Sequence, residues 1–341
     1  MSKIVGKEIN MQKSVVELLF DWFDHTTLAV SKELDEPYLE SLAYAMELLF
    51  HQEVPEYFSE MTKHKLQKLL TEEIVSSAHD PLHIRKAVQL AILKGMKGQT
   101  QQQHLMTPET VALLVGYLAE KLMNKRETVR LFDPACGTAN LLTTVMSHLS
   151  GKNVTAFASE VDPTLIRLGV AHANLLEMDI EFFQQDSLRP FLIDPVDLIV
   201  ADLPVGYYPD DVQADKFELK AAEGHSYAHH LFIEQSLYYT KESSYAIFIV
   251  PHFLFDSDQS DQLHQYLQKY TEIVSVIQLP ESAFVSKEQA KSILVVRKKG
   301  EHTQPIRQPM FVNMPSFSDT LAMEDILTQM NDWFKTNEAI L

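Results

Sequence analysis

The chain has 341 residues, 45% of them hydrophobic and 22% charged, which is ordinary for a globular protein with one large domain and a smaller one. Its 47 acidic and 29 basic side chains give a net charge of −18. The overall electrostatic field of such a chain repels nucleic acid, although a local basic patch is compatible with this net charge. No apolar run reaches about 18 residues and the N-terminus has no signal-peptide core, so we expect a cytoplasmic protein without a membrane partner.

Residues 1–100 are expected to form an N-terminal helical bundle. Apolar side chains recur at helical spacing in three segments, 14–23, 38–50 and 63–75. Breaks that contain proline separate the helices, at 36–37, 54–55 and 80–81. The polar stretch 97–104 is expected to be a linker or an entry loop.

From about residue 105, short apolar runs alternate with helical stretches, which predicts an α/β layer fold. The first helix of this region is expected to have Thr107 as its N-cap and Pro108 at its first position. Several runs are continuous in Val, Ile, Leu and Phe, as in parallel strands buried on both faces. The seven expected strands are 129–135, 153–160, 180–186, 196–204, 244–251, 273–280 and 292–299.

The link between the last two runs is too short for a packed crossover helix, so we expect the last strand to be antiparallel. The prediction is therefore a seven-stranded, mostly parallel, Rossmann-like sheet over residues 101–318, followed by a C-terminal helix over residues 319–341.

Three successive predicted strands end in an acid, namely Asp133, Glu160 and Asp186. Parallel sheets bind ligands beyond the carboxyl ends of their strands. The turn "DPACGTAN" has one glycine, Gly137, and so lacks the G-x-G-x-x-G pattern of a dinucleotide site. Glu160 follows Gly137 by 23 residues, close to the spacing at which an acid reaches a ribose, and Asp186 can accept a hydrogen bond from an adenine amine. Each acid alone would fit a solvated strand end, but the ordered set favours a cofactor with an amine, a ribose and a positive centre.

Residues 105–299 resemble the class I S-adenosylmethionine-dependent methyltransferases, and among them the amino-methylating group. The segments that carry this resemblance are "MTPETVALLVGYL", "DPACGTANLL", "SEVDP", "QQDSL" and "DLIVADLP". The later segments "AIFIVPHFLF" and "VIQLPESAFVSKEQAKSILVVRKK" resemble the modification subunits of type I restriction systems and their stand-alone YtxK relatives. The helical region before them is similar to the N-terminal domain of that family.

The resemblance implies S-adenosylmethionine as the cofactor. It implies that Asp133, Thr107 and the loop through Thr138 hold the methionine part, Glu160 the ribose and Asp186 the adenine. The full set of expected cofactor residues is Thr107, Asp133, Pro134, Ala135, Cys136, Gly137, Thr138, Glu160, Val161, Asp186, Ser187, Asp202 and Pro204. Ala139 departs from the glycine usual in the family, and we expect modest consequences from it.

The segment "VADLPVGYYP" is expected to orient the methyl acceptor. Enzymes of the amino-methylating group carry Asn or Asp, Pro, Pro and an aromatic residue after the fourth strand. A side-chain oxygen and a backbone carbonyl accept the two protons of the amine, and the aromatic ring stacks on the extruded base. Here the four positions are Asp202, Leu203, Pro204 and Val205. We therefore expect Asp202, Pro204 and the Leu203 carbonyl to orient the amine, while Val205 cannot stack.

Two tyrosines follow this motif, and Tyr207 is the candidate replacement for the missing aromatic ring. The alternative for Tyr207 and Tyr208 is a loop packed against the helical domain.

No metal site is expected. The sequence has two histidine pairs, His79 with His83 and His229 with His230, but neither has a supporting ligand cluster, and methyl transfer needs no metal. Cys136, the single cysteine, excludes an internal disulfide and is interpreted as a packing residue of the cofactor loop.

Three functions remain open from the sequence. The first is site-specific DNA adenine-N6 methylation, with a partner specificity subunit supplying DNA recognition. The second is methylation of RNA or of a protein amide, and an acidic enzyme that acts on a basic protein would suit the negative charge. The third is a catalytically weak protein that binds S-adenosylmethionine as part of a complex.

Overall fold

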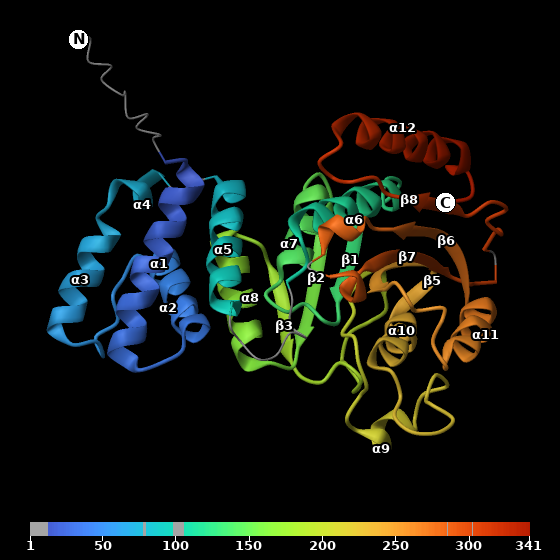
Figure 1. The fold of residues 1–341 in the computed structure, drawn as a ribbon, viewed down its shortest axis with the longest axis horizontal. Helices are drawn as coiled ribbons and strands as arrows, with labels where there is room; N and C mark the ends of the chain where they lie inside the picture. Colours follow the sequence, from blue (N-terminus) through green and yellow to red (C-terminus); the bar gives the residue numbers. More distant parts are fainter. Residues whose placement is uncertain (1–12, 78–79, 98–105, 285, 302) are drawn as a thin grey trace, which may run out of the picture. The chain divides into compact units, whose positions relative to one another are not determined.

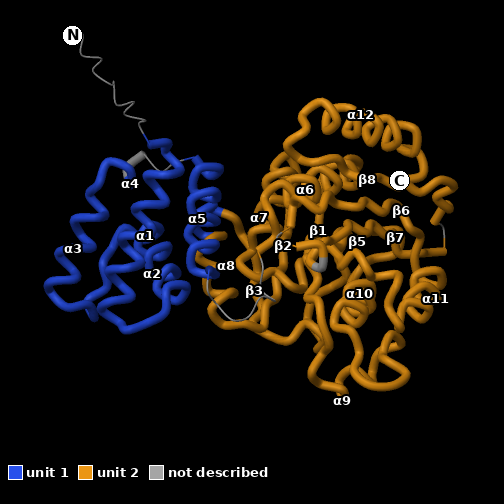
Figure 2. Tube along the Cα trace, in the orientation of Figure 1, with its two compact units in different colours: residues 1–100, 174–177 blue, residues 101–173, 178–341 orange. Residues whose placement is uncertain are grey.

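The computed structural model describes residues 13–77, 80–97, 106–284, 286–301 and 303–341. The chain divides into two compact units (Figure 2), one made of residues 1–100 and 174–177 and the other of residues 101–173 and 178–341. The linker predicted over residues 97–104 lies outside the described residues apart from Lys97.

The first unit is helical, as the apolar spacing predicted. Its helices are α1 (Val15–Leu34), α2 (Tyr38–His51), α3 (Glu60–Leu70), α4 (Glu73–Ser77) and α5 (Pro81–Met96). Helix α1 begins at a capping box, in which the side chains of Ser14 and Glu17 each accept a hydrogen bond from the backbone N–H of the other residue. It ends at Asp35, whose φ of 54° is left-handed. The indole Nε1 of buried Trp22 donates to the Leu69 carbonyl at 2.9 Å, which links α1 to the end of α3.

The second unit is an α/β structure whose described residues form a sheet of eight strands in the order β3-β2-β1-β4-β5-β7-β6-β8 (Figure 1). The strands are β1 (Thr128–Asp133), β2 (Asn153–Glu160), β3 (Ile180–Gln184), β4 (Val196–Asp202), β5 (Thr240–Pro251), β6 (Thr271–Gln278), β7 (Lys291–Lys298) and β8 (Met310–Asn313). The helices are α6 (Glu109–Leu122), α7 (Asn140–His148), α8 (Pro163–Leu175), α9 (Asp211–Ala214), α10 (Ala228–Tyr238), α11 (Ser260–Tyr270) and α12 (Thr320–Asn337), with short 3-10 turns η1 (Glu281–Ala283) and η2 (Lys287–Gln289). No helix among the described residues of either unit is long and apolar enough to span a lipid bilayer.

Strands β1 to β5 pair in parallel, whereas β7 is antiparallel to both β5 and β6, as the short connection predicted. The seven predicted strands are present, but the predicted strand number was one too low because β8 was missed. Strand β8 has 4 residues, pairs in parallel with β6 at the edge of the sheet, and alternates between buried and exposed side chains. Such a short edge strand gives no continuous apolar run in the sequence.

The side chains of the sheet alternate between two apolar cores. Leu131 and Ile247 face a core that they share with α6, α7 and α12, whereas Phe132 and Phe248 face a core that they share with α10 and α11. Helices therefore cover both faces (Figure 1), which explains the continuous apolar strands. Polar side chains converge instead at the carboxyl edge of the sheet, where the strands lead into loops.

The buried indole of Trp22 provides a test of the helical unit. We expect Trp22→Ala to lower its free energy of unfolding by about 3 to 5 kcal/mol, because a large side chain and a buried hydrogen bond are lost together. The matched control is Leu18→Ala on the same helix, since Leu18 is 41% exposed and its loss is expected to change stability by about 0.5 kcal/mol or less. Urea unfolding followed by circular dichroism measures both. Equal effects of the two substitutions would contradict the packing described here.

Candidate functional site

The carboxyl edge of the sheet gathers the acids that the sequence singled out. Strand β1 ends at Asp133, β2 at Glu160 and β4 at Asp202, while Asp186 lies just after β3. Because these strands pair in parallel, their carboxyl ends lie at one edge. The structure thus brings together side chains that are far apart in the sequence.

Asp133 is the most deeply buried of these acids, with 1% of its surface exposed. Burial raises its pKa well above the usual range, and the negative charges of Asp202 and Glu160 raise it further. One hydrogen bond opposes this shift, since the backbone N–H of Ala135 donates to Asp133 Oδ1 at 3.0 Å. Asp133 is therefore a carboxyl group that strongly favours a cation or a proton beside it.

The loop between β1 and α7 contains the predicted cofactor residues 134–138. Gly137 has a left-handed φ of 52°, and a side-chain carbon placed there would meet no atom within 4 Å, so this backbone borders open space. Ala139 is also left-handed, with a φ of 59°, and fully buried. That conformation costs a non-glycine residue about 1 kcal/mol, which is the physical consequence of alanine at this position.

Glu160 joins this loop to the next one. Its Oε2 accepts from the Gly137 N–H at 3.1 Å, and its Oε1 accepts from the N–H groups of Val161 at 2.8 Å and Asp162 at 2.9 Å. Three backbone donors thus fix the orientation of the carboxylate at the tip of β2.

The third acid, Asp186, contacts the segment that was expected to orient the methyl acceptor, residues 200–209, which we call the acceptor segment. Asp186 Oδ1 accepts from the Leu188 N–H at 3.0 Å, and Oδ2 accepts from the hydroxyl of Tyr208. The neighbouring Ser187 hydroxyl donates to the Pro134 carbonyl at 2.5 Å, which connects this turn to the loop after β1. Cys136 in that loop is buried, and burial raises its pKa, so its thiol stays protonated.

Asp202 has both carboxylate oxygens engaged. Oδ2 accepts from the Thr107 hydroxyl at 2.8 Å, and Oδ1 accepts from the ammonium of Lys291. The Thr107 carbonyl accepts from Asn140 Nδ2 at 3.0 Å, so Thr107 also contacts the start of α7. The prediction that Thr107 caps the following helix was wrong: Pro108 is the N-cap of α6, and the Thr107 hydroxyl serves Asp202 instead.

Lys291 was not predicted as a site residue from the sequence. It is the first residue of β7, and the antiparallel course of that strand brings its start beside the carboxyl end of β5, where Lys291 pairs with Pro251. No motif spacing marks this residue, because its proximity to Asp202 depends on the strand order. The one feature of the sequence that could have indicated Lys291 is its position directly before the apolar residues of a predicted strand.

The rest of the acceptor segment turns back against its own unit. The Leu203 side chain is buried and its N–H donates to the Ile249 carbonyl at 3.0 Å. Val205 is 38% exposed, whereas Tyr207 is 58% exposed and stacks on Tyr227 with ring centroids 4.9 Å apart and an interplanar angle of 13°. Both Tyr207 and Tyr208 thus have partners within the α/β unit.

The aromatic stack continues into the protein through His229, whose ring centroid lies 5.0 Å from that of Tyr227. His229 and His230 are fully buried, and within the described residues their ring nitrogens have no hydrogen-bond partner. Burial lowers the pKa of His229 to about 3 and that of His230 to about 4, so both rings are neutral near pH 7. Of the other pair, His79 lies outside the described residues.

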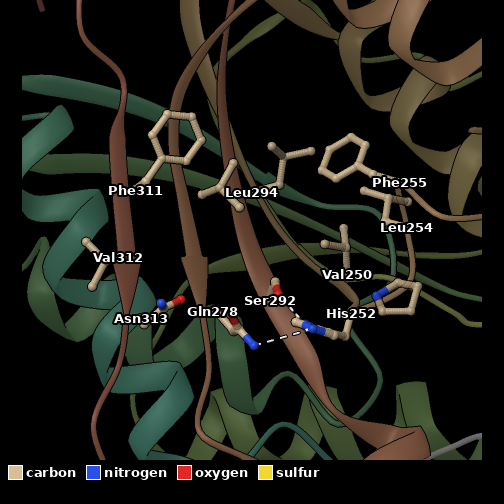
Figure 3. Close-up of a pocket in the computed structure, with 12 residues that line it drawn as sticks. Val250, His252, Leu254, Phe255, Gln278, Ser292, Leu294, Phe311, Val312 and Asn313 are labelled. Carbon is tan, nitrogen blue, oxygen red and sulfur yellow. Dashed lines mark hydrogen bonds between the residues drawn. The ribbon is translucent and has the colours of Figure 1, made fainter. Parts of the chain in front are cut away.

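A pocket of about 290 Å³ lies at the carboxyl ends of β5, β6 and β8, and Figure 3 shows the side chains that line it. Its polar end is a short chain of contacts, in which His252 Nδ1 lies 3.3 Å from Ser292 Oγ and His252 Nε2 lies 3.3 Å from Gln278 Nε2. Apolar side chains form most of the remaining lining, namely Val250, Leu254, Phe255, Val276, Leu294, Phe311 and Val312, and Asn313 adds a further polar side chain. The pocket therefore suits an uncharged group with one polar edge.

Two family models match this chain. Residues 94–337 match the family described as N-6 DNA Methylase. The chain belongs to the N-6 DNA methylase family. Residues 17–96 match the YtxK N-terminal helical domain. A Bacillus subtilis protein named YtxK is 43% identical over 328 residues, which cover 95% of this chain and 99% of that protein.

Solved structures agree with this assignment of the N-6 DNA methylase fold. A Listeria monocytogenes protein assigned to the class I S-adenosylmethionine-dependent methyltransferases is 39% identical, with a TM-score of 0.87 over 94% of this chain and 99% of that chain. The methyltransferase subunit of a Streptococcus thermophilus type I restriction-modification system shares the fold at 14% identity, with a TM-score of 0.61 over 92% of this chain and 73% of that chain. This N-6 DNA methylase family member is accordingly an S-adenosylmethionine-dependent methyltransferase.

The carboxyl edge fits S-adenosylmethionine, which supplies a methyl group on a sulfonium centre. Gly137 borders open space, and the carboxylates around it supply acceptors for amine and hydroxyl groups. The buried Asp133, whose raised pKa reflects an unfavourable negative charge, gains most from a cationic ligand.

Asp133 gives a test that separates stability from binding. Its raised pKa means that the native state loses stability as pH rises from the unfolded value near 4 through the folded value, because the buried group must then ionise. We expect Asp133→Asn to unfold about 2 to 4 °C above the wild type at pH 8 without cofactor, with a smaller difference at pH 5, and to bind S-adenosylmethionine at least tenfold more weakly.

The control is Asp325→Asn on α12, where the carboxylate is exposed. Thermal unfolding at several pH values and calorimetric titration give the two readouts. An Asp133→Asn protein less stable than the wild type at pH 8 would contradict the account of a strained buried carboxyl.

Proposed function

We propose that this methyltransferase acts on the exocyclic N6 amine of adenine in DNA, with Asp202 and the Leu203 carbonyl as the acceptors of the amine protons. The observation that carries the proposal is the position of Asp202 at the carboxyl end of β4, near enough to Asp133 for its charge to raise the Asp133 pKa. The acceptor-orienting carboxylate thus neighbours the cofactor acids, as methyl transfer between two bound molecules requires.

For the cofactor, we propose that Asp133, Thr107 and the loop 134–138 bind the methionine part. Glu160 and Val161 bind the ribose, and Asp186 and Ser187 bind the adenine. Two contacts bear on these roles: Glu160 already holds the Gly137 backbone, and Asp186 already accepts from the Tyr208 hydroxyl. An adenine amine at Asp186 would therefore share or displace the Tyr208 hydrogen bond.

Asp202 suits the role of hydrogen-bond acceptor for the amine, because a carboxylate offers about four lone-pair sites and its described contacts occupy two. A conjugated amine is a weak nucleophile, since its lone pair is delocalised into the ring. Hydrogen bonds from its two protons to Asp202 and to the Leu203 carbonyl, whose direction Pro204 helps to fix, favour tetrahedral nitrogen. The lone pair then points at the methyl group, while the protein supplies orientation.

We propose that Tyr207 supplies the stacking that Val205 cannot. Its ring is 58% exposed and braced by Tyr227 behind it, so its outer face is a rigid platform for a base. Stacking of a base on an aromatic ring is worth about 1 to 3 kcal/mol.

DNA recognition is proposed to come from a partner specificity subunit. The net charge of −18 gives this chain little electrostatic attraction for phosphates. A second candidate acceptor is an RNA or a protein amide, and the negative charge favours the amide of a basic protein. A catalytically weak cofactor-binding protein is the third, favoured by the departures Leu203 and Val205 from the family motif.

The test follows labelled methyl from S-adenosylmethionine into an undermethylated cell extract. We expect the wild type to label a fraction that DNase removes, and Asp202→Ala to lower that label about 100-fold or more. The control is Asp211→Ala, since Asp211 is an exposed acid at the start of α9 that pairs with His225. Thermal shift with the cofactor verifies that each variant still binds it.

Label that RNase or protease removes would replace DNA by the corresponding acceptor. A protein that the cofactor stabilises but that transfers no label would overturn stand-alone catalysis.

A further inference from the structure

One basic side chain, that of Lys291, lies among the acids at the carboxyl edge of the sheet. Lys291 directs its ammonium onto Asp202 Oδ1, on the side of the carboxylate opposite Thr107. The pair is mostly buried, with 20% of the Lys291 side chain and 13% of the Asp202 side chain exposed. Solvent therefore screens this ion pair less than a surface pair.

The backbone holds Lys291 in place. The residue pairs with Pro251 at the end of β5, while Asp202 pairs with Ile249 of the same strand. The carbonyl of Lys291 accepts from the Leu279 N–H at 3.3 Å. The sheet thus fixes the backbone of Lys291, and the contact with Asp202 holds its ammonium at the site.

The charges around it belong to one electrostatic cluster. Asp133 on β1 senses the charges of Asp202 on β4 and Glu160 on β2, so the three carboxylates interact. Lys291 offsets one of these negative charges through direct contact with Asp202. The potential beside Asp202 therefore depends on this cation as well as on the neighbouring acids.

Methyl transfer changes the charge of the cofactor. The bond between sulfur and methyl carbon breaks, its electron pair stays on sulfur, and the acceptor nitrogen bonds the carbon and gives up a proton. S-adenosylmethionine, with a sulfonium cation, becomes S-adenosylhomocysteine, with a neutral thioether. A strongly negative site would bind the first much more tightly than the second.

We propose that Lys291 is a specificity-determining residue that limits the preference of this site for the cationic cofactor over its neutral product. Without the ammonium, the site carries one more uncompensated negative charge. Two unit charges about 8 Å apart, at an effective dielectric constant of about 30 to 60, between that of a protein surface and that of bulk water, interact by enough to change an affinity about three- to tenfold. The proposal rests on the cofactor and is independent of the methyl acceptor.

Calorimetric titration of the full chain with S-adenosylmethionine and with S-adenosylhomocysteine tests the proposal. The readout is the ratio of the Kd for the product to the Kd for the cofactor. We expect Lys291→Met to raise this ratio about three- to tenfold. Lys291→Gln, which keeps a hydrogen-bond donor toward Asp202 but not the charge, is expected to raise it similarly and serves if the methionine variant is unstable.

Two controls keep the positive charge at the site. Lys291→Arg retains the cation, and Lys287→Met removes an exposed lysine that pairs with Glu281 in the preceding turn. Both are expected to leave the ratio within about twofold of the wild type. A ratio that is unchanged or lower in both neutral variants would overturn the proposal, because Lys291 would then be a structural partner of Asp202 alone.

Failure of the proposed function can be distinguished from failure of this proposal. The first would appear as an absence of labelled methyl in DNA, and it would leave the two cofactor affinities unchanged.

Discussion

The accumulation of negative charge at the carboxyl edge of the sheet is the constraint on which the rest of the site depends. Parallel pairing of β1, β2 and β4 places the ends of these strands together, and each ends in an acid. Asp133 is nearly inaccessible to solvent and its pKa is raised by burial and by its neighbours, so the edge favours a cation. Three groups fit this negative edge. The cofactor contributes a sulfonium cation, and the chain contributes the Thr107 hydroxyl and the Lys291 ammonium, which both donate to Asp202.

The loops around this edge are connected to one another rather than independent. Glu160 holds the Gly137 backbone, the Ser187 hydroxyl reaches the Pro134 carbonyl, and the Tyr208 hydroxyl reaches Asp186. Through these contacts the acceptor segment after β4 is linked to the loop after β3, and that loop to the one after β1. Such linkage joins the proposed cofactor and acceptor segments in one framework, and positioning is the main contribution a protein can make when the cofactor supplies the reactive group.

Local patterns in the sequence predicted most of the fold and the acids of the site. Apolar periodicity located α1, α2 and α3 of the first unit and seven strands, and the carboxyl-end rule brought Asp133 and Glu160 together. Contacts that depend on strand order could not be predicted this way. Lys291 reaches Asp202 only because β7 runs antiparallel beside β5, and the stacking of Tyr207 on Tyr227 joins two loops. Thr107 was assigned to a cap because its tertiary partner is distant in sequence.

A crystal structure with S-adenosylhomocysteine bound tests the central claim most directly, because it shows where the cofactor lies relative to the acids. The account predicts ligand density along the carboxyl ends of β1 and β2, with the ribose hydroxyls at Glu160 and the sulfur on the Asp202 side. Density in the pocket beside His252 and Ser292, with the acidic edge filled only by water, would contradict it.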